Sequence, residues 1–326
     1  MDNLIITQTP FRISLGGGGT DLPFYSKVKG GQLIAGSINQ YITVSISNRP
    51  LDSKILLQTT DVQFADNLND IKNKIIREAL RYYNLYNSMQ VSTFSTLPSR
   101  IGLGTSSTLM VGLVKGLSLL KKQDLSQMEI GSISHHIERE ILQLQGGIQD
   151  QYIAAIGGLQ IIRVDEKGHV TSRSLDLADN ILNQLQEHII LIYTGTERDS
   201  EKIIKSQQSD LEKTIEIYDQ IKDIGYQSID LLQNADIEGL GIAMDNHWNL
   251  KKSISNQMSN TKFDKMYLDF KRLGSPGGKI IGAGGGGFFL MTVPHNITKY
   301  KNKIRELGYQ WLDWKFDMQG TRSVDL

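Results

Sequence analysis

Two uninterrupted runs of four glycines, at residues 16–19 and 284–287, constrain the fold of this chain more than any other feature. Glycine loses more backbone freedom on folding than any other residue, so a run of four is costly to order in a plain turn. Thirteen of the 31 glycines fall in four short loops, which hold these two runs together with Gly102, Gly104, Gly146, Gly147 and Gly282. We therefore expect these loops to bring the backbone close to a ligand.

The overall charge and residue content exclude several classes of function. Lys and Arg together number 35, as do Asp and Glu, so no global field draws the chain to nucleic acid or to an anionic membrane. The lack of cysteine excludes a disulfide scaffold, a thiolate zinc site and a cysteine nucleophile. No basic stretch with a following apolar run precedes Pro10, and the largely uncharged run at 280–294 is shorter than the roughly 20 residues that a membrane span needs. We expect a soluble, cytoplasmic protein that recognises small molecules.

Hydrophobic periodicity predicts an α+β fold, because strands and helices mix without regular βαβ alternation. Helical periods fill residues 199–274 almost completely, which places a soft domain boundary within 176–196 and suggests domains 1–185 and 186–326. The expected strands are 41–47, 54–60, 89–95, 159–164, 189–193, 287–293 and 310–314, and the other expected helices are 69–86, 106–122, 126–145 and 297–307.

The segment Pro-Ser-Arg-Ile-Gly-Leu-Gly-Thr-Ser-Ser-Thr at residues 98–108 is the most informative of the glycine loops, because it leads directly into a helical pattern. Glycines let backbone amides turn toward one point, and a helix N-terminus adds unpaired N–H groups and the positive end of the helix dipole. This combination favours phosphate. The hydroxyls that follow can cap the helix or bind magnesium, and a plain capped turn is the alternative. It is not a Walker A sequence, because no lysine follows the glycines.

Three segments together, 10–23, 98–108 and 282–287, resemble the signature motifs of the GHMP kinase family, which includes galactokinase, homoserine kinase, mevalonate kinase and phosphomevalonate kinase. Thr105 and Ser106 stand at the paired-serine positions of the family's phosphate loop. The resemblance implies ATP and Mg²⁺ as cofactors. It also implies an N-terminal domain like domain 2 of ribosomal protein S5 and a C-terminal ferredoxin-like domain, with the nucleotide and the acceptor between them.

The same resemblance assigns roles to charged residues. Asp150 follows Glu138 by twelve positions, as a catalytic aspartate follows a magnesium-binding glutamate in the family's sugar kinases. Asp150 would accept the proton of the attacking hydroxyl, Glu138 and Ser106 would hold Mg²⁺, and Arg12 would stabilise developing charge. Asp21, nine positions after Arg12, would bind sugar hydroxyls. The alternatives are a solvated helix face and a loop cap for Glu138 and Asp150, and a surface ion pair for Arg12 and Asp21.

The predicted site therefore has three parts. The catalytic residues are Asp150 and Arg12, and the metal ligands are Ser106 and Glu138. The predicted ATP phosphate site consists of Pro98, Gly102, Leu103, Gly104, Thr105, Ser106, Ser107 and Thr108. The predicted acceptor site consists of Gly17, Gly18, Gly19, Thr20, Asp21, Gly147, Arg198, Gly284, Gly285 and Gly286.

The identity of the acceptor is predicted from the similarity of shorter motifs to particular members of the family. Four features resemble the heptose kinases of the family: the run at 16–23, Gly-x-Gln-Asp-Gln-Tyr at 147–152, the Gly-Gly pair at 157–158, and Thr-Gly-Thr at 194–196 with Arg198. Those kinases phosphorylate the anomeric (C1) hydroxyl of D-glycero-α-D-manno-heptose 7-phosphate on the route to GDP-heptose. L-Fucokinase is the closest rival. A galactokinase-like sugar 1-kinase fits less well, because galactokinases carry Gly-Glu-His-Thr-Asp at the position of 17–21. A phosphorylated sugar needs a cationic clamp, for which Arg198 is the first candidate, followed by Arg100, Lys202, Lys251 and Lys252.

A function of another class, a non-catalytic sugar or ATP sensor on the same fold, is left open by the sequence. The complete set of Arg12, Ser106, Glu138 and Asp150 argues against it, because a sensor has no need for a proton acceptor. Two weaker features favour structural roles: His136 with Glu140 as a surface pair, and Trp248 as a core residue. The sequence does not fix the oligomeric state, and a homodimer is compatible with it.

Overall fold

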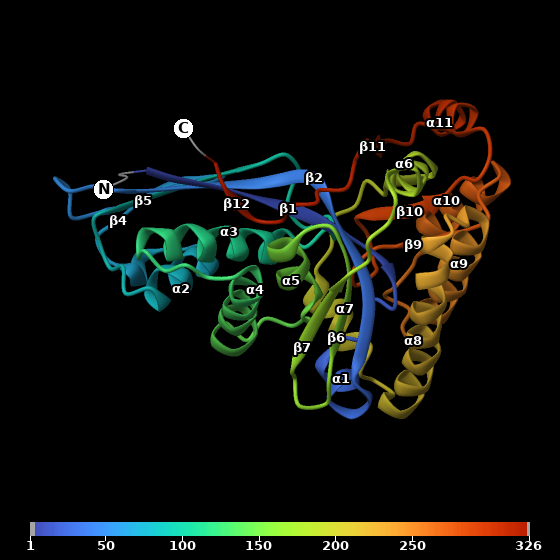
Figure 1. Cartoon of the computed structure of the whole chain (residues 1–326), viewed down its shortest axis with the longest axis horizontal. Coiled ribbons are helices and arrows are strands. Elements are labelled where there is room, and N and C mark those ends of the chain that lie inside the picture. The colour runs from blue at the N-terminus through green and yellow to red at the C-terminus, as the bar shows by residue number, and fades with distance from the viewer. Residues whose placement is uncertain (1–3, 325–326) are drawn as a thin grey trace.

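A long antiparallel pair of strands organises the larger sheet of the computed structural model, which describes residues 4–324 (Figure 1). β1 (Leu4–Gly16) and β2 (Gly31–Asn48) pair along most of their length, with register shifts between Pro10 and Phe11 and between Ser14 and Gly16. They are connected through α1 (Pro23–Lys29). Residues 1–3 and 325–326, at the outer ends of the two predicted domain ranges, lie outside this description.

The two halves of β2 have different partners on the side away from β1. The first half pairs with β6 (Leu159–Val164), and the second half pairs with β5 (Met89–Ser95). The eight-stranded sheet is completed by β3 (Ile55–Gln58), β4 (Val62–Ala65), β7 (Val170–Ser174) and β12 (Arg322–Ser323). The sheet therefore branches at β2.

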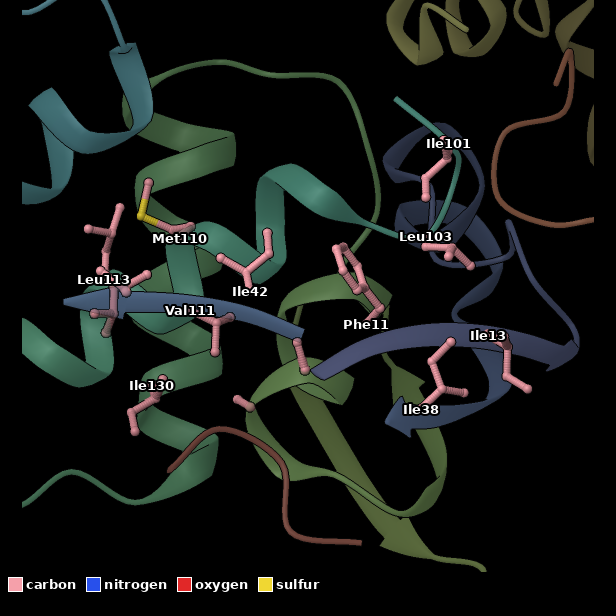
Figure 2. Close-up of a cluster of buried hydrophobic side chains, with 14 of the residues drawn as sticks. Phe11, Ile13, Ile38, Ile42, Ile101, Leu103, Met110, Val111, Leu113 and Ile130 are labelled. Carbon is pink, nitrogen blue, oxygen red and sulfur yellow. The ribbon is translucent and has the colours of Figure 1, made fainter. Parts of the chain in front are cut away.

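One face of this sheet carries the helices of the first half of the chain (Figure 1). They are η1 (Leu68–Asp70), α2 (Lys74–Tyr82), α3 (Thr105–Leu120), α4 (Gln127–His136), the π-helix η2 (Ile137–Ile141) and α5 (Gln149–Ile156). Side chains of β1, β2, α3 and α4 share one buried cluster, part of which is drawn in Figure 2. Gly112 lets α3 approach β1, because a Cβ there would lie 3.0 Å from Thr9 Oγ1.

The smaller sheet has the order β11 (Trp311–Leu312), β8 (Ile189–Tyr193), β10 (Phe288–Thr292) and β9 (Gly278–Ile280), with every pair antiparallel. The helices of this half are α6 (Asp179–His188), α7 (Ser200–Ser206), α8 (Leu211–Gln233), α9 (Ile237–Ile254), α10 (Thr261–Arg272) and α11 (Ile297–Glu306). Trp248 is fully buried, with its ring centre 6.2 Å from that of Phe289. Trp248 is therefore a core residue.

The α+β class is confirmed, and the strands 89–95, 159–164 and 189–193 have the predicted bounds. The helix predicted from residue 69 begins only at Lys74, because the Asn73 side chain caps it by accepting from the amides of Ile75 and Ile76. The helix predicted over 126–145 ends early, because π-type bonding interrupts it at 137–141. Within residues 4–324, the structure has no helix with both the length and the apolar character that crossing a membrane requires.

Candidate active site

A cavity of about 570 Å³ opens where the four glycine loops meet. Each loop contributes at least one glycine to its lining: Gly18 and Gly19, Gly102 and Gly104, Gly146 and Gly147, and Gly282. The walls come from both halves of the chain, because residues of β1 and α5 line the cavity together with residues of α9 and β9. The four loops therefore meet at one cavity, and their approach to a ligand there stays a prediction.

In the loop before α3, buried apolar residues alternate with glycines of positive φ. Ile101 and Leu103 are fully buried in the same cluster as Phe11 of β1 (Figure 2), whereas Gly102 and Gly104 both have φ near +83°. Only glycine adopts this backbone conformation at no steric cost. Gly104 is the N-cap of α3, and no side chain caps the helix. The hydroxyl cap considered from the sequence is therefore not formed, and the first amides of α3 have no capping side chain.

Arg12 and Asp150 form a close ion pair inside the cavity. Arg12 Nε and Nη2 both lie 2.7 Å from Asp150 Oδ1, and Arg12 Nη1 donates to the Gly102 carbonyl at 2.9 Å. Arg12 is almost fully buried on β1, and Asp150 lies in the first turn of α5. Burial alone would raise the pKa of Asp150, but the positive charges of Arg12 and Arg139 outweigh it, so the pKa is lowered and the carboxylate is ionised at neutral pH.

Ser106 and Glu138 meet at the same end of α3. Ser106 Oγ donates to Glu138 Oε1 at 2.7 Å, and Gln151 Nε2 donates to both Glu138 Oε2 and Ser107 Oγ. Glu138 is fully buried: it lies four positions after Ser134, which is also fully buried, and so continues the inward face of α4. It belongs to the π-helix η2, where the Leu142 amide bonds to the Ile137 carbonyl five residues earlier. Glu138 is therefore not part of a solvated helix face.

Asp21 lies against the start of α5, the helix that carries Asp150. Its Oδ2 accepts from the Gln149 amide at 3.0 Å, and a Cβ at Gly147 would lie only 2.0 Å from that oxygen. Burial raises the pKa of Asp21 above its usual value, and the charge of Asp150 adds to this shift. The hydrogen bond from the Gln149 amide opposes the shift only in part. Asp21 is buried and forms no surface ion pair.

Three side chains that the sequence analysis missed present unpartnered polar atoms at the cavity. Ser14 Oγ, Gln149 Oε1 and Gln207 Nε2 are buried and have no hydrogen-bond partner in the described chain, and all three residues line the cavity. A buried polar atom without a partner is costly, so these positions fit the hydroxyl groups of a ligand. Ser14 lies two positions after Arg12 on β1, so both side chains belong to the same face of the strand. This spacing could have predicted that Ser14 lines the same site as Arg12.

A group of basic side chains, composed of Arg198, His247, Lys251 and Lys279, lines the wall from the second half of the chain. Arg198 is half-buried, and the other three are buried. Arg198 Nη1 donates to the carbonyls of Ile281, Gly284 and Gly286. Lys251 Nζ donates to the Gly282 carbonyl at 2.9 Å, and Lys279 Nζ lies 3.5 Å from His247 Nδ1. Arg198 and Lys251 were predicted from the sequence, whereas His247 and Lys279 were not.

The other predicted clamp residues are placed differently. Arg100 is exposed at the rim of the cavity, with φ of +61°. Lys202 is exposed and pairs loosely with Asp199 at 3.9 Å. Lys252 Nζ lies over the Trp248 ring, 5.9 Å from its centre, and is not part of the cavity lining.

Several predicted binding residues lie outside the cavity lining. Pro98, Leu103, Thr108, Gly17, Thr20 and the run 284–286 are not among the described residues that line the cavity. Thr20 Oγ1 bonds to the carbonyls of Gly17 and Gln32, both at 2.8 Å. A Cβ at Gly285 would lie 2.4 Å from Ile203 Cδ1. Close packing of protein against protein, rather than close approach to a ligand, therefore explains these glycines.

The predicted surface pair of His136 and Glu140 is present, with His136 Nδ1 2.8 Å from Glu140 Oε2 and Glu140 exposed. Among residues 4–324 there is no group of three or more His, Cys, Asp or Glu side chains arranged to hold a metal ion. A metal at Ser106 and Glu138 would thus need further ligands from a bound molecule or water.

Comparison with known proteins agrees with this geometry. Residues 70–158 match the family described as "GHMP kinases N terminal domain". The chain is 31% identical to the D-glycero-α-D-manno-heptose 7-phosphate kinase of Campylobacter jejuni, over 98% of each sequence. It also resembles the crystal structure of a D-glycero-D-manno-heptose 1-phosphate kinase from Bacteroides thetaiotaomicron, with a TM-score of 0.81, 23% identity and 99% of each chain covered. A putative sugar kinase from C. jejuni gives a TM-score of 0.79 at 29% identity, again over 99% of each chain. On the strength of the full-length match at 31% identity, this chain belongs to the GHMP kinase family.

Proposed function

We propose that this chain transfers the γ-phosphoryl group of ATP to the anomeric (C1) hydroxyl of D-glycero-α-D-manno-heptose 7-phosphate. The observation that supports the proposal most strongly is the Arg12–Asp150 ion pair. Both residues line the same cavity as the glycine loop at the start of α3. The full-length similarity to a heptose 7-phosphate kinase supports the acceptor. Kinases of this family are ATP-dependent, so ATP is the phosphoryl donor.

The donor phosphates fit the loop at 98–108. The free amides at the start of α3 and the positive end of the helix dipole attract phosphate oxygens. Thr105 Oγ1, which is buried and unpartnered, adds a hydrogen-bond donor at the cavity wall. Ile75 and Leu109 line the adjoining part of the cavity and offer an apolar surface for the adenine base.

Asp150 orients the acceptor hydroxyl and takes its proton. In phosphoryl transfer the new bond forms between the sugar oxygen and the γ-phosphorus, the bond to the bridging oxygen of ADP breaks, and the hydroxyl proton passes to the carboxylate. A lowered pKa keeps Asp150 ionised before the reaction, so it is ready to accept a proton that leaves late. Arg12 fixes the carboxylate and faces the charge that develops on the transferred group.

Ser106 and Glu138 would hold Mg²⁺. Their oxygen atoms lie 2.7 Å apart beside the phosphate loop, and hydroxyl and carboxylate oxygens are the ligand types that Mg²⁺ prefers. The ion would neutralise phosphate charge when bound. Gln151, which donates to the second carboxylate oxygen, keeps Glu138 oriented toward Ser106.

Asp150→Asn tests the proposal. The amide cannot accept the proton, so we expect kcat with heptose 7-phosphate to fall about 10²- to 10⁴-fold, while the Kd for ATP stays nearly unchanged. A coupled ADP-release assay measures kcat, and calorimetry measures ATP binding. Glu140→Gln, which removes an exposed carboxylate of η2, is the matched control. A variant that keeps a tenth or more of wild-type kcat would refute the role of Asp150.

The same assay identifies the acceptor. Wild-type protein is tested with heptose 7-phosphate, mannose, L-fucose, galactose and mevalonate. We expect heptose 7-phosphate to give the highest kcat/KM, and NMR of the product to show phosphate on C1. A higher kcat/KM with L-fucose or galactose would overturn the proposed acceptor, and no ADP release with any sugar would favour a sensor.

A further inference from the structure

Two lysines in the wall of the cavity lack the counter-ion that buried lysines usually have. Lys251 is 5% exposed and Lys279 is 2% exposed, and neither forms an ion pair with any carboxylate in the described part of the chain. Removing an ammonium group from water is costly unless an anion compensates for it. A negatively charged ligand would supply the missing charge.

The fold brings these two lysines and His247 to one place. His247 and Lys251 are four positions apart on α9 and therefore on the same face of that helix. Lys279 lies on β9, the strand that packs against α9, and its Nζ is 3.5 Å from His247 Nδ1. All three residues line the cavity. They form what we call the α9–β9 cluster: His247, Lys251 and Lys279.

The histidine supplies a second, independent sign of a missing ligand. Lysine only donates, so Nδ1 of His247 accepts from Lys279 and Nε2 carries the ring proton. His247 is 1% exposed, and its Nε2 completes no hydrogen bond within 3.5 Å among the described residues, although the nearby Gly18 backbone favours the protonated ring. An unpaired buried donor beside unpaired ammonium groups calls for an acceptor with several oxygens.

Arg198 is less suited to this task, although it also lines the cavity. Its Nη1 is occupied by three carbonyls, those of Ile281, Gly284 and Gly286, and a Cβ at Gly102 would lie 2.6 Å from its Nη2. The guanidinium thus fastens the last glycine loop to the phosphate loop. In the α9–β9 cluster, by contrast, Lys279 makes one long contact and keeps other donor positions free.

We propose that the α9–β9 cluster binds the phosphate group that the acceptor sugar already carries, while the sugar's reacting hydroxyl faces Asp150. This inference rests on the proposed function for the identity of the acceptor. It assigns acceptor selectivity to two ammonium groups and one imidazole N–H, which recognise a phosphate monoester dianion. The unpartnered groups of Ser14, Gln149 and Gln207 would contact the sugar between the two ends.

Lys279→Met tests the cluster by selectivity. We expect KM for heptose 7-phosphate to rise about 10- to 100-fold, because charge-assisted hydrogen bonds to the phosphate are lost, while kcat/KM for the unphosphorylated heptose changes less than about threefold. Lys252→Met, on the same helix but outside the cavity lining, is the control and should change neither value. Equal losses with both sugars, or a loss in kcat alone, would overturn the proposal, because the lysine would then act on the transferred phosphoryl group.

A binding measurement separates this inference from the proposed function. Calorimetry follows inorganic phosphate binding to protein saturated with a non-hydrolysable ATP analogue, so that the nucleotide's phosphate sites are filled. We expect wild type to bind one phosphate and Lys279→Met to bind it at least tenfold more weakly. No phosphate binding by wild type, or equal binding by both proteins, would overturn the cluster. If wild type binds phosphate but turns over no sugar phosphate, the proposed function fails and the cluster stands.

The melting temperature of Lys279→Met shows whether a loss of phosphate affinity results from unfolding. Because an unpaired buried ammonium is unfavourable, Lys279→Met should melt at the wild-type temperature or higher. Lys279→Arg restores the positive charge and should recover part of the selectivity for the phosphorylated sugar. A lower Tm together with no recovery by arginine would mean that Lys279 has only a structural role.

Discussion

Most of the charged residues proposed for catalysis and binding are buried, and burial shifts the pKa values of several of them. Burial, with the nearby charges of Lys251 and Arg12, lowers the pKa of Lys279 to about 7, and burial with Arg198 and Arg12 lowers that of Lys251 to about 8. Both values lie in the range where enzymes are assayed. In the absence of substrate, these lysines therefore lose their protons as the pH rises through 7 and 8.

The affinity for a phosphorylated acceptor should follow this titration. A phosphate monoester becomes a dianion above about pH 6, whereas Lys279, with His247, Lys251 and Arg12 around it, is charged only below about pH 7. We expect KM for the sugar phosphate to be lowest between these values and to rise at higher pH. Steady-state kinetics from pH 6 to 9 tests this. In Lys279→Met the inflection near pH 7 should vanish, and a flat wild-type profile would contradict the prediction.

The sequence was informative wherever a functional residue belongs to a motif. Arg12, Asp21, Ser106, Glu138 and Asp150 were all named from the sequence, and the structure brings all five to one cavity. Their catalytic and binding roles stay predictions. His247 and Lys279 could not be found in this way, because neither belongs to a recognised motif and the two come together only when α9 packs on β9.

At the scale of elements, the predictions failed where the local pattern is ambiguous. Residues 4–16 form β1, although Pro10 and the glycine run made this stretch look like a loop. The proline is compatible with the strand because the register of β1 with β2 shifts beside it. The π-helix η2 was missed because Ile137 and Ile141 continue the apolar spacing of an ordinary helix. The inward position of Glu138 is shown by its full burial and by its contacts with Ser106 and Gln151.

The turn into α3 is an element whose conformation can be tested. At Gly104, φ is +83°, and an added Cβ would lie 3.1 Å from Asp150 Oδ2. Gly104→Ala should destabilise the fold by about 1–2 kcal/mol, because an L-residue is strained in this conformation, and should also displace Asp150 and lower kcat at least tenfold. Gly168→Ala is a matched control, since φ there is +86° and no atom lies within 4 Å of the added Cβ.

Urea unfolding and ADP release together separate the two effects. Both glycine variants should lose a similar amount of stability, since both suffer the same backbone strain. Only Gly104→Ala should lose activity. If Gly168→Ala lost activity as well, backbone strain in general, rather than the contact between Gly104 and Asp150, would explain the result.

At the scale of the whole molecule, one buried hydrophobic cluster joins the two sheets, while the other face of the smaller sheet packs a second cluster around Phe289. The largest buried cluster joins Ile13 and Ile34 of the larger sheet to Leu191 and Leu290 of the smaller one. The boundary proposed from the sequence, between 185 and 186, falls inside α6. The last strand, β12, also returns to the larger sheet, where it pairs with β1 through Thr7 and Ser323. We infer that the proposed domain ranges describe architecture and do not fold separately.

Unfolding tests this coupling, because the probes report on different parts of the chain. All three tryptophans, at positions 248, 311 and 314, belong to the second half, so fluorescence reports on 186–326 while far-UV circular dichroism reports on the whole chain. Since exposing either side of the shared cluster removes packing from the other, we expect both signals to change in one transition with coincident midpoints. An ATP analogue should shift both midpoints upward together. Two separated transitions, with fluorescence following only one, would show that each half is stable alone.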